Sequence, residues 1–286
     1  MLDPDAFTFG VLAKSPLPGI LLYGPPGTGK TLLVRALAKE SNSTMITVSS
    51  ADIRSRYVSE GEKKIQRLFA FGRKCHSCII FIDECDSLFG ERSRNGNTRG
   101  HNNDLTQFLV EMDGINAKDT RRPVVIAATN RPYDLDEGIL RRLGRRILVD
   151  VPDLSGREHI LRILLRDEPL AEDVNLLEIA QSTPDYTGSD LEKLVIEAAL
   201  RAVSQNHANG SHERRVLTRS HFLWASKVMQ PSPKSDSVSK IREFHRKYGS
   251  SGWNGSFAHG ARIVNHAKTF EKNIRGQNGT SPNSGS

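Results

Sequence analysis

The sequence predicts an α/β fold, a parallel β-sheet with helices on both faces, followed by a small all-helical domain. Short apolar runs alternate with helical periodicity as far as Pro152, which is typical of β–α–β units. The most apolar of these runs are β-branched and uncharged, as expected of strands that are buried on both faces. After Pro152 the apolar residues recur only at helical spacing, which predicts helices alone.

Five strands and three helices are expected in the first half of the chain. The strands are Gly19–Tyr23, Thr44–Val48, Cys78–Ile82, Val124–Ala128 and Ile147–Val151. The helices are Thr31–Glu40, Ser59–Arg73 and Asp104–Met112. The polar, glycine-containing stretch Asn95–Asn103 is expected to be a loop.

Helices follow one another after Pro152. Those expected are Ser155–Arg166, Asn175–Gln181, Ser189–Gln205 and Ser220–Met229. The candidate N-caps are Ser155, Ser189 and Ser220. Ser235–Tyr248 is expected to form one more helix, and the Gly-, Ser- and Asn-rich composition from Ser250 onward predicts disorder.

The net charge is concentrated near the C-terminus. The 286 residues include 40 Lys and Arg against 33 Asp and Glu, a formal net charge of +7. Residues 231–286 hold 9 of these basic residues and 3 of the acidic ones, so +6 of the net charge lies in the last fifth of the chain. No RNA- or DNA-binding motif accompanies this charge, so we expect a solvated tail and no specific nucleic-acid partner. Weak, salt-sensitive contacts between the tail and acidic tubulin or anionic lipid are the alternative.

The apolar runs and the cysteines indicate an intracellular protein. Uninterrupted apolar runs such as Ile79–Ile82 are far shorter than the ~20 residues that a membrane span requires, and no secretory signal is recognisable. Three cysteines in the whole chain favour a reducing compartment. Cys75, His76, Cys78 and Cys85 could in principle bind zinc. We favour the interpretation that the cysteines are small apolar residues flanking a buried strand.

The segment GPPGTGKT at residues 24–31 matches G-x-x-x-x-G-K-[ST] in full. Its glycines let successive backbone N–H groups turn inward as an anion-binding nest, and the helix N-terminus adds its dipole. Lys30 can reach the β- and γ-phosphates of ATP, and the Thr31 hydroxyl can ligate Mg²⁺. The residues expected to hold the nucleotide are Gly24, Pro25, Pro26, Gly27, Thr28, Gly29, Lys30, Thr31 and Leu32. The pattern predicts the sheet of a P-loop nucleoside triphosphatase.

Two carboxylates, Asp83 and Glu84, follow the apolar run that ends at Ile82. If this strand neighbours the phosphate-loop strand, its carboxyl end reaches the same crevice. Asp83 would then hold Mg²⁺, and Glu84 would orient and deprotonate the attacking water. Taken alone, the pair could be only a polar strand end, but together with the phosphate loop it predicts ATP hydrolysis.

Three motifs in this order resemble the AAA family of ATPases. They are GPPGTGKT at 24–31 (Walker A), IIFIDECDSLFGER at 79–92 (Walker B) and VVIAATNRPYDLDEGILRR at 124–142. Within the family the chain most resembles the meiotic-clade group of katanin, spastin, the ESCRT-disassembling ATPase and the outer-mitochondrial-membrane extractase. The resemblance implies the following domains: a linker remnant at 1–17, a large α/β nucleotide-binding domain at 18–153, a helical lid at 154–230, a C-terminal helix at 231–249 and a disordered basic tail at 250–286.

The resemblance also implies roles for single residues. Asn130 is similar to sensor 1, whose amide would bond the γ-phosphate or the attacking water, although an Asn here could simply form a turn. Gly188 and Ser189 match the start of the lid helix that packs on adenine. Arg141 and Arg142 resemble arginine fingers, which would complete the site of the next subunit. Arg145 is a third candidate, and a solvated charge cluster is the alternative.

The segment Arg56-Tyr57-Val58 resembles a central-pore loop. Tyr57 would grip the substrate polypeptide without sequence preference, and the alternative is a tyrosine packed on the surface. Residues Arg94–His101 would form a second pore loop.

By resemblance the chain is expected to form a homo-hexamer that hydrolyses ATP between subunits and remodels, extracts or unfolds a protein substrate through its pore. The family has more residues than Met1–Leu17 ahead of the phosphate-loop strand, which suggests an N-terminally truncated chain. The alternative function is therefore a nucleotide-binding scaffold without productive hydrolysis. The expected location is the cytosol or the cytosolic face of an organelle, the mitochondrial outer membrane being one candidate. The sequence does not identify the substrate.

Overall fold

The computed structural model describes residues 19–53, 60–90, 99–114, 123–208 and 214–250. These residues form two compact units. Unit 1 contains the described residues of Met1–Gly24, Leu37–Val149 and Ser239–Trp253, and unit 2 contains Pro25–Ala36 and the described residues of Asp150–Val238. The expected linker remnant at 1–17 and, after Ser250, the expected disordered tail lie outside the described residues.

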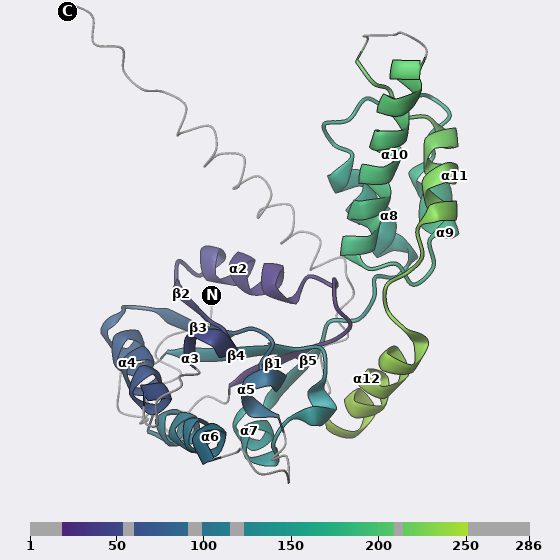
Figure 1. Cartoon of the computed structure of the whole chain (residues 1–286). Coiled ribbons are helices and arrows are strands. Elements are labelled where there is room, and N and C mark those ends of the chain that lie inside the picture. Colours follow the sequence, from purple (N-terminus) through teal and green to yellow (C-terminus); the bar gives the residue numbers. More distant parts are fainter. Residues whose placement is uncertain (1–18, 54–59, 91–98, 115–122, 209–213, 251–286) are drawn as a thin grey trace, which may run out of the picture. The chain divides into compact units, whose positions relative to one another are not determined.

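Unit 1 is built on a five-stranded sheet. Its strands are β1 (Ile20–Tyr23), β2 (Thr44–Val48), β3 (Cys78–Ile82), β4 (Val124–Thr129) and β5 (Arg145–Leu148). All neighbours are parallel, in the order β2-β3-β4-β1-β5 (Figure 1). Every residue of β3 is buried, so both faces of the sheet are covered there. The parallel sheet and the helices of unit 2 confirm the predicted fold class.

Helices connect the strands, as parallel pairing requires. They are α2 (Lys30–Glu40), α3 (Ser50–Ile53), α4 (Glu60–Lys74), α5 (Asp86–Phe89), α6 (Arg99–Asp113), the 3₁₀ turn Pro132–Asp134 and α7 (Glu137–Arg142). A further helix, α12 (Ser235–Tyr248), comes later in the chain and connects no strands. The short helices α3, α5 and α7 were not predicted, because one helical turn carries too little periodicity to detect.

Two expectations about unit 1 are wrong. The polar stretch expected as a loop up to Asn103 is already helical from Arg99. The strand expected at Ile147–Val151 runs instead over Arg145–Leu148, because its first two residues pair with Ile20 and Leu21. As an edge strand that is only partly buried, β5 tolerates arginines that a central strand would exclude. The condition considered for Asp83 and Glu84, that β3 neighbours β1, is not met, since β4 lies between the two strands.

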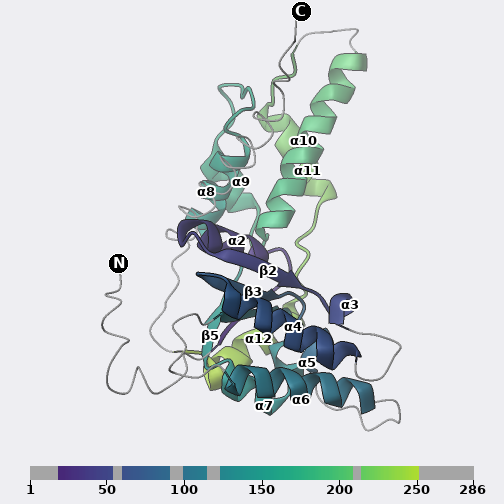
Figure 2. The same ribbon diagram turned by 90° about the vertical axis from the view of Figure 1, so that its left-hand side faces the viewer.

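The core of unit 1 is centred on an aromatic cluster from α4, α5 and α6. Phe108 is fully buried, and its ring centroid lies 5.3 Å from that of Phe69 and 4.7 Å from that of Phe89. The helices α4 and α6 lie side by side in both views (Figures 1 and 2). Aromatic pairs in this geometry add to the free energy gained from apolar burial, so this cluster holds the two helices together.

The cysteines belong to this core. Cys78 and Cys85 are buried in it and Cys75 packs against it, and burial raises the pKa of the Cys85 thiol well above its usual range. Within the described ranges, no group of three or more His, Cys, Asp and Glu side chains is placed to hold a metal ion. The burial of Cys78 and Cys85 fits small apolar residues rather than zinc ligands.

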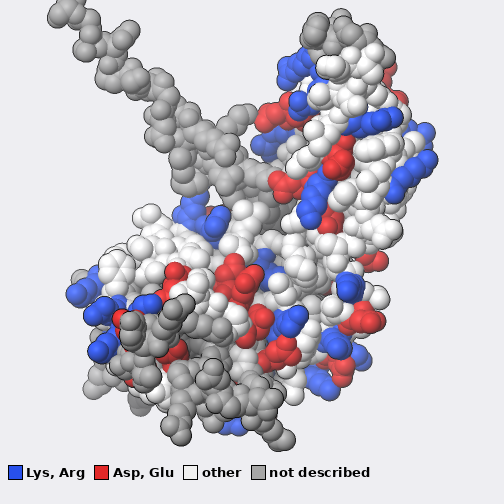
Figure 3. Space-filling view, in the orientation of Figure 1, with Lys and Arg blue, Asp and Glu red and all other residues white. Residues whose placement is uncertain are grey.

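Unit 2 is a helical bundle with its own apolar core. It contains α8 (Leu154–Leu164), α9 (Leu176–Ser182), α10 (Gly188–Ala208) and α11 (Arg219–Val228). Leu161, Leu191, Leu194 and Phe222 are among its buried residues. On the face of unit 2 shown in Figure 3, Lys and Arg are interspersed with Asp and Glu, as in an ordinary solvated surface.

The predicted serine caps are wrong: Ser155, Ser189 and Ser220 all lie inside their helices. The residue just ahead of α8, Asp153, accepts from the N–H of Gly156 at 2.7 Å. Thr218 forms a capping box at the start of α11. A residue that precedes the helix and has a side-chain oxygen acts as the N-cap, even where a serine follows it.

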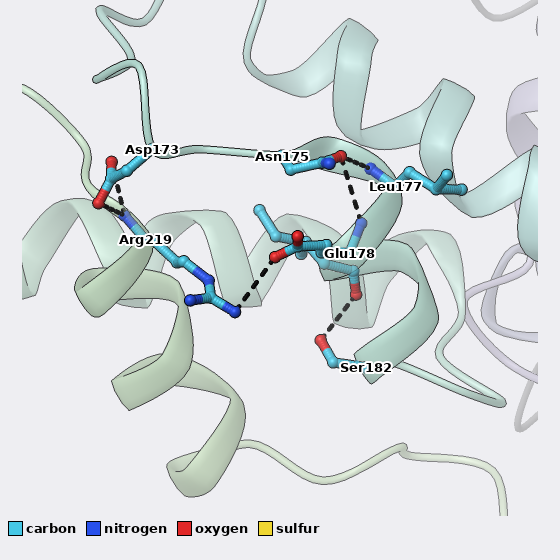
Figure 4. A network of polar contacts seen from close by, with 7 residues as sticks. Asp173, Asn175, Leu177, Glu178, Ser182 and Arg219 are labelled. Carbon is cyan, nitrogen blue, oxygen red and sulfur yellow. Dashed lines mark hydrogen bonds and ion pairs between the residues drawn. The ribbon is translucent and has the colours of Figure 1, made fainter.

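Side-chain contacts join α9 to α11 (Figure 4). Asn175 caps α9 through the N–H groups of Leu177 and Glu178. Arg219 donates its backbone N–H to the carboxylate of Asp173 and forms an ion pair of 3.2 Å with Glu178. These exposed contacts fix how the two helices start. Over the described part of the chain, no helix has the length and apolar character that crossing a bilayer requires.

Replacing Phe108 by Ala is expected to lower the free energy of unfolding by about 3–5 kcal/mol, because it opens a cavity among three buried rings. Chemical denaturation measures the change. The matched control is Phe71→Ala on α4, whose side chain is 56% exposed and whose loss is expected to cost less than about 0.5 kcal/mol. Equal losses for the two variants would contradict this account of the core.

Candidate active site

The parallel sheet collects several candidate site residues at its carboxyl edge. Gly24 follows β1, Asp83 and Glu84 follow β3, and Asn130 follows β4. The register pairs Tyr23 with Thr129, so these strand ends meet along one edge. In open α/β sheets this edge is where ligands bind. Unit 1 thus brings together Gly24, both carboxylates and the asparagine.

Glu84 has an unusual backbone conformation. Its φ is +48°, a left-handed value that costs a non-glycine residue free energy. The turn is held by the Glu84 N–H, which donates to Asp83 Oδ1 at 3.0 Å, and by the Ser87 hydroxyl, which donates to the Glu84 carbonyl at 2.7 Å. The Glu84 side chain is exposed, so its carboxylate lies where water can reach it.

Asn130 carries a buried polar atom whose partner is missing among the described atoms. Its Oδ1 is buried and accepts no hydrogen bond there, which is costly unless a ligand supplies the partner. The neighbouring Thr129 hydroxyl donates to Asp86 at 2.6 Å and accepts from the Arg131 N–H at 2.8 Å, which fixes the turn. An amide held in this way at a strand end fits contact with a nucleotide phosphate or its attacking water.

The phosphate loop has the conformation that an anion requires. Gly27 and Gly29 have φ values of +77° and +90°, which turn backbone N–H groups toward one side. A Cβ on Gly29 would meet nothing within 4 Å, so that side is open. The ammonium of Lys30 is buried and donates to the Pro25 carbonyl at 2.7 Å. A buried cation beside an open ring of N–H donors fits the phosphates of ATP.

Each unit carries one oxygen donor of a kind that suits Mg²⁺. Thr31 follows Lys30 in α2, and Asp83 follows β3; both are partly buried. Hydroxyl and carboxylate oxygens are the ligands that Mg²⁺ prefers, and it typically takes only one or two from the protein beside phosphate oxygens and water. The donor chemistry therefore fits this ion.

Within unit 2, the start of α10 contacts the phosphate loop. The Ser189 N–H donates to the Gly27 carbonyl at 3.2 Å, and a Cβ on Gly27 would lie 2.8 Å from Thr187 Oγ1. Gly188, whose own Cβ would lie 3.5 Å from the Gly27 carbonyl, is part of the same contact. The two lid residues that the family resemblance singles out thus lie against the loop.

A buried carboxylate holds this helix start in place. Asp190 is 1% exposed, and its Oδ2 accepts from the N–H and hydroxyl of Thr187 and from the N–H and hydroxyl of Ser232. Burial alone would raise the pKa of Asp190, but the hydrogen bonds from Ser232 and Thr187 outweigh it and the pKa is lowered. Sequence patterns gave no sign of this role, because Ser232 lies 42 residues away.

Asp190→Asn is expected to lower the free energy of unfolding by about 1–3 kcal/mol at pH 7, since some donors lose their acceptor. A carboxyl with a lowered folded pKa stabilises the protein above its unfolded pKa of about 3.9, and this stabilisation is lost as the pH falls. The difference between wild type and variant should therefore shrink between pH 6 and pH 3. Urea unfolding across this range tests it; a constant difference would contradict it.

The arginine candidates differ in how firmly they are held. The side chain of Arg141 is 78% exposed, with only a 3.7 Å ion pair to Glu137, and Arg145 is exposed on β5. Arg142 instead forms a two-pronged ion pair with Asp113 at the end of α6, its Nε lying 2.8 Å from Oδ1. The hydrogen bond from Arg142 holds the pKa of Asp113 below its usual range. Arg141 and Arg145 thus point to solvent, whereas Arg142 is anchored.

Arg142→Ala is expected to lower the free energy of unfolding by about 1 kcal/mol, and less in 1 M salt, because a partly exposed ion pair is lost. Arg141→Ala, the matched control from the preceding position, should change it by less than about 0.5 kcal/mol. Thermal and urea unfolding of the two variants provide the comparison. The assignment is wrong if Arg141→Ala is the more destabilising substitution.

The predicted pore residue Tyr57 lies outside the described residues, as does most of the second predicted pore loop, Arg94–His101. Only the end of that second segment is described, as the first turn of α6.

Comparison with known proteins matches both units. The model of the ATPase family associated with various cellular activities (AAA) matches residues 20–151, and that of the AAA+ lid domain matches residues 173–222. The chain is 33% identical to the solved AAA domain of FIGL-1 in complex with ADP, with a TM-score of 0.73, over 86% of this chain and 82% of that one. The chain therefore belongs to the AAA family of ATPases.

Among curated proteins the similarity includes spastin, as the sequence motifs predicted. The chain is 40% identical to spastin of Danio rerio over 255 residues, which are 87% of this chain and 44% of that protein. It is also 40% identical to a Cell division cycle protein 48 homolog of Archaeoglobus fulgidus, over 80% of this chain and 33% of that protein. The chain thus spans less than half the length of these relatives.

Proposed function

We propose that this chain is a Mg²⁺-dependent ATPase that uses ATP hydrolysis to remodel, extract or unfold protein substrates. The observation that carries the proposal is the meeting of β1, which leads into the phosphate loop, with Glu84 and Asn130 at one sheet edge. A loop for phosphates, an accessible carboxylate and an amide with an unsatisfied buried oxygen are the components of phosphoryl transfer to water.

Each component has its own task in this proposal. The N–H groups of the phosphate loop and Lys30 bind the phosphates and orient the γ-phosphate. Thr31 and Asp83 would hold Mg²⁺, which when bound neutralises phosphate charge. Asn130 positions the attacking water, and Glu84 takes its proton as general base. The start of α10, at Gly188 and Ser189, holds the adenine side of the nucleotide.

Arg141 is the arginine proposed to act on the nucleotide of a neighbouring subunit. Its exposed side chain can reach another molecule, and a guanidinium there stabilises charge in the transition state. This role requires a ring, which we propose to be a homo-hexamer with Tyr57 in the pore. Arg142, held by Asp113, would position the segment that carries Arg141. The three free cysteines suit a reducing compartment, and we propose the cytosol or the cytosolic face of an organelle.

Replacing Glu84 by Gln is expected to lower kcat for ATP hydrolysis by about 10²-fold or more, while ATP binding is retained, because only the proton acceptor is removed. Phosphate release measures turnover, and a fluorescent ATP analogue measures binding. The control is Glu192→Gln on the exposed face of α10, which should leave both unchanged. Equal turnover of Glu84→Gln and wild type would refute the enzyme mechanism. Binding without turnover by the wild type at every protein concentration would favour a nucleotide-binding scaffold.

A further inference from the structure

We infer that the C-terminal helix α12 is a positioning element for the ATP site, and that His245 is the residue through which it acts, by a hydrogen bond to Tyr23 at the end of β1. This inference rests on the proposed function. It assigns to His245 no contact with the nucleotide, so His245 is a positioning residue and not a catalytic one.

The contact joins residues 222 positions apart. Tyr23 is fully buried, and its hydroxyl lies 2.6 Å from Nδ1 of His245. Phe244 packs edge-on against the Tyr23 ring, with centroids 5.2 Å apart, and Ile241 is buried in the same core. Helix α12 therefore buries its apolar face in unit 1 and places His245 on the last residue of β1.

The surroundings of the Tyr23 hydroxyl keep its proton in place. Burial, partly offset by the nearby Arg146 guanidinium, raises the pKa of Tyr23 to about 12. The hydroxyl is therefore protonated at neutral pH and can donate to Nδ1. Gly249 leaves room for the imidazole, because a Cβ there would lie 2.3 Å from Nδ1. The ring is thus held between the end of α12 and Tyr23.

A displacement of Tyr23 passes directly to the phosphate loop. The next residue, Gly24, donates its N–H to the Thr129 carbonyl at 3.4 Å, and the Val149 N–H donates to the Tyr23 carbonyl at 2.8 Å. A Cβ on Gly24 would lie 2.0 Å from the Val149 carbonyl oxygen, so the backbone is tightly packed at Gly24. The position of the Tyr23 ring therefore sets where the loop begins.

The same C-terminal end of α12 also holds the segment that bears the arginines. Arg146 and Ser250 are joined by two hydrogen bonds, from the Arg146 N–H to Ser250 Oγ at 2.9 Å and from the Ser250 N–H to the Arg146 carbonyl at 3.0 Å. The guanidinium donates to the Tyr248 carbonyl at 3.3 Å and lies over the Tyr248 ring. It also donates to the carbonyls of Leu140 and Leu143 beside Arg141. In both views α12 lies beside β5 (Figures 1 and 2). One helix thus contacts the strand that feeds the phosphate loop and the segment proposed to act in trans.

The test uses the full chain with Tyr23→Phe, His245→Ala and the double variant. Tyr23→Phe removes one hydroxyl and keeps the buried ring, so it retains the fold. Each single variant is expected to weaken binding of a fluorescent ATP analogue and raise KM for ATP about threefold to tenfold, with kcat changed less than about twofold. Both substitutions remove the same hydrogen bond. The double variant is therefore expected to bind the ATP analogue about as tightly as either single variant.

Rescue and control variants separate positioning from general damage. His245→Asn keeps an acceptor near the position of Nδ1 and is expected to restore KM to within about twofold of wild type. Glu243 on the same helix pairs with Lys247 at an exposed site, so Glu243→Gln should change nothing. Unchanged binding in both single variants, additive effects, or no rescue by Asn would overturn the inference while leaving the ATPase proposal intact. A wild type that binds no ATP analogue would overturn both.

Discussion

The parallel hydrogen-bond register of the five strands is the constraint on which the rest of unit 1 depends. Because every strand runs in the same direction, every strand end reaches the same edge, and helices must carry the chain back each time. Strand interiors such as β3 are buried along their length and leave no place for polar chemistry. The polar residues therefore follow the strands, which is why Gly24, Asp83, Glu84 and Asn130 gather there.

The sequence predicted elements well where the local apolar pattern decides their bounds. The bounds of β2, β3 and α12 match the expectation to the residue, since each has a regular apolar pattern. The prediction failed where the bounds of an element depend on another residue that pairs with it or caps it. The start of β5 is set by pairing with β1 despite two arginines, and the cap of α8 is Asp153 because it precedes the serine that was expected. The order of the strands was not predicted, because it depends on pairing between segments that lie far apart in the sequence.

The residues of the candidate site differ in the same way: local sequence identifies some of them, and only packing identifies the others. The phosphate loop, Asp83, Glu84 and Asn130 could be selected from local spacing, because each stands next to a recognisable strand. The anchoring of Arg142 by Asp113 spans 29 residues, and the pair of Tyr23 and His245 spans 222. No local pattern indicates such contacts. They arise only when separate elements pack, and they distinguish exposed arginines from anchored ones.

Unit 1 is assembled from segments that lie on both sides of unit 2 in the chain. During synthesis the sheet therefore emerges without Ile241 and Phe244, which fill its core only after the whole lid has been made. Until then the buried ring of Tyr23 lacks its cover and its hydrogen-bond partner. The helical unit, whose core is drawn from one nearly continuous stretch, is able to fold first. Among the described elements, α12, the last to be synthesised, thus completes the packing around β1, the first.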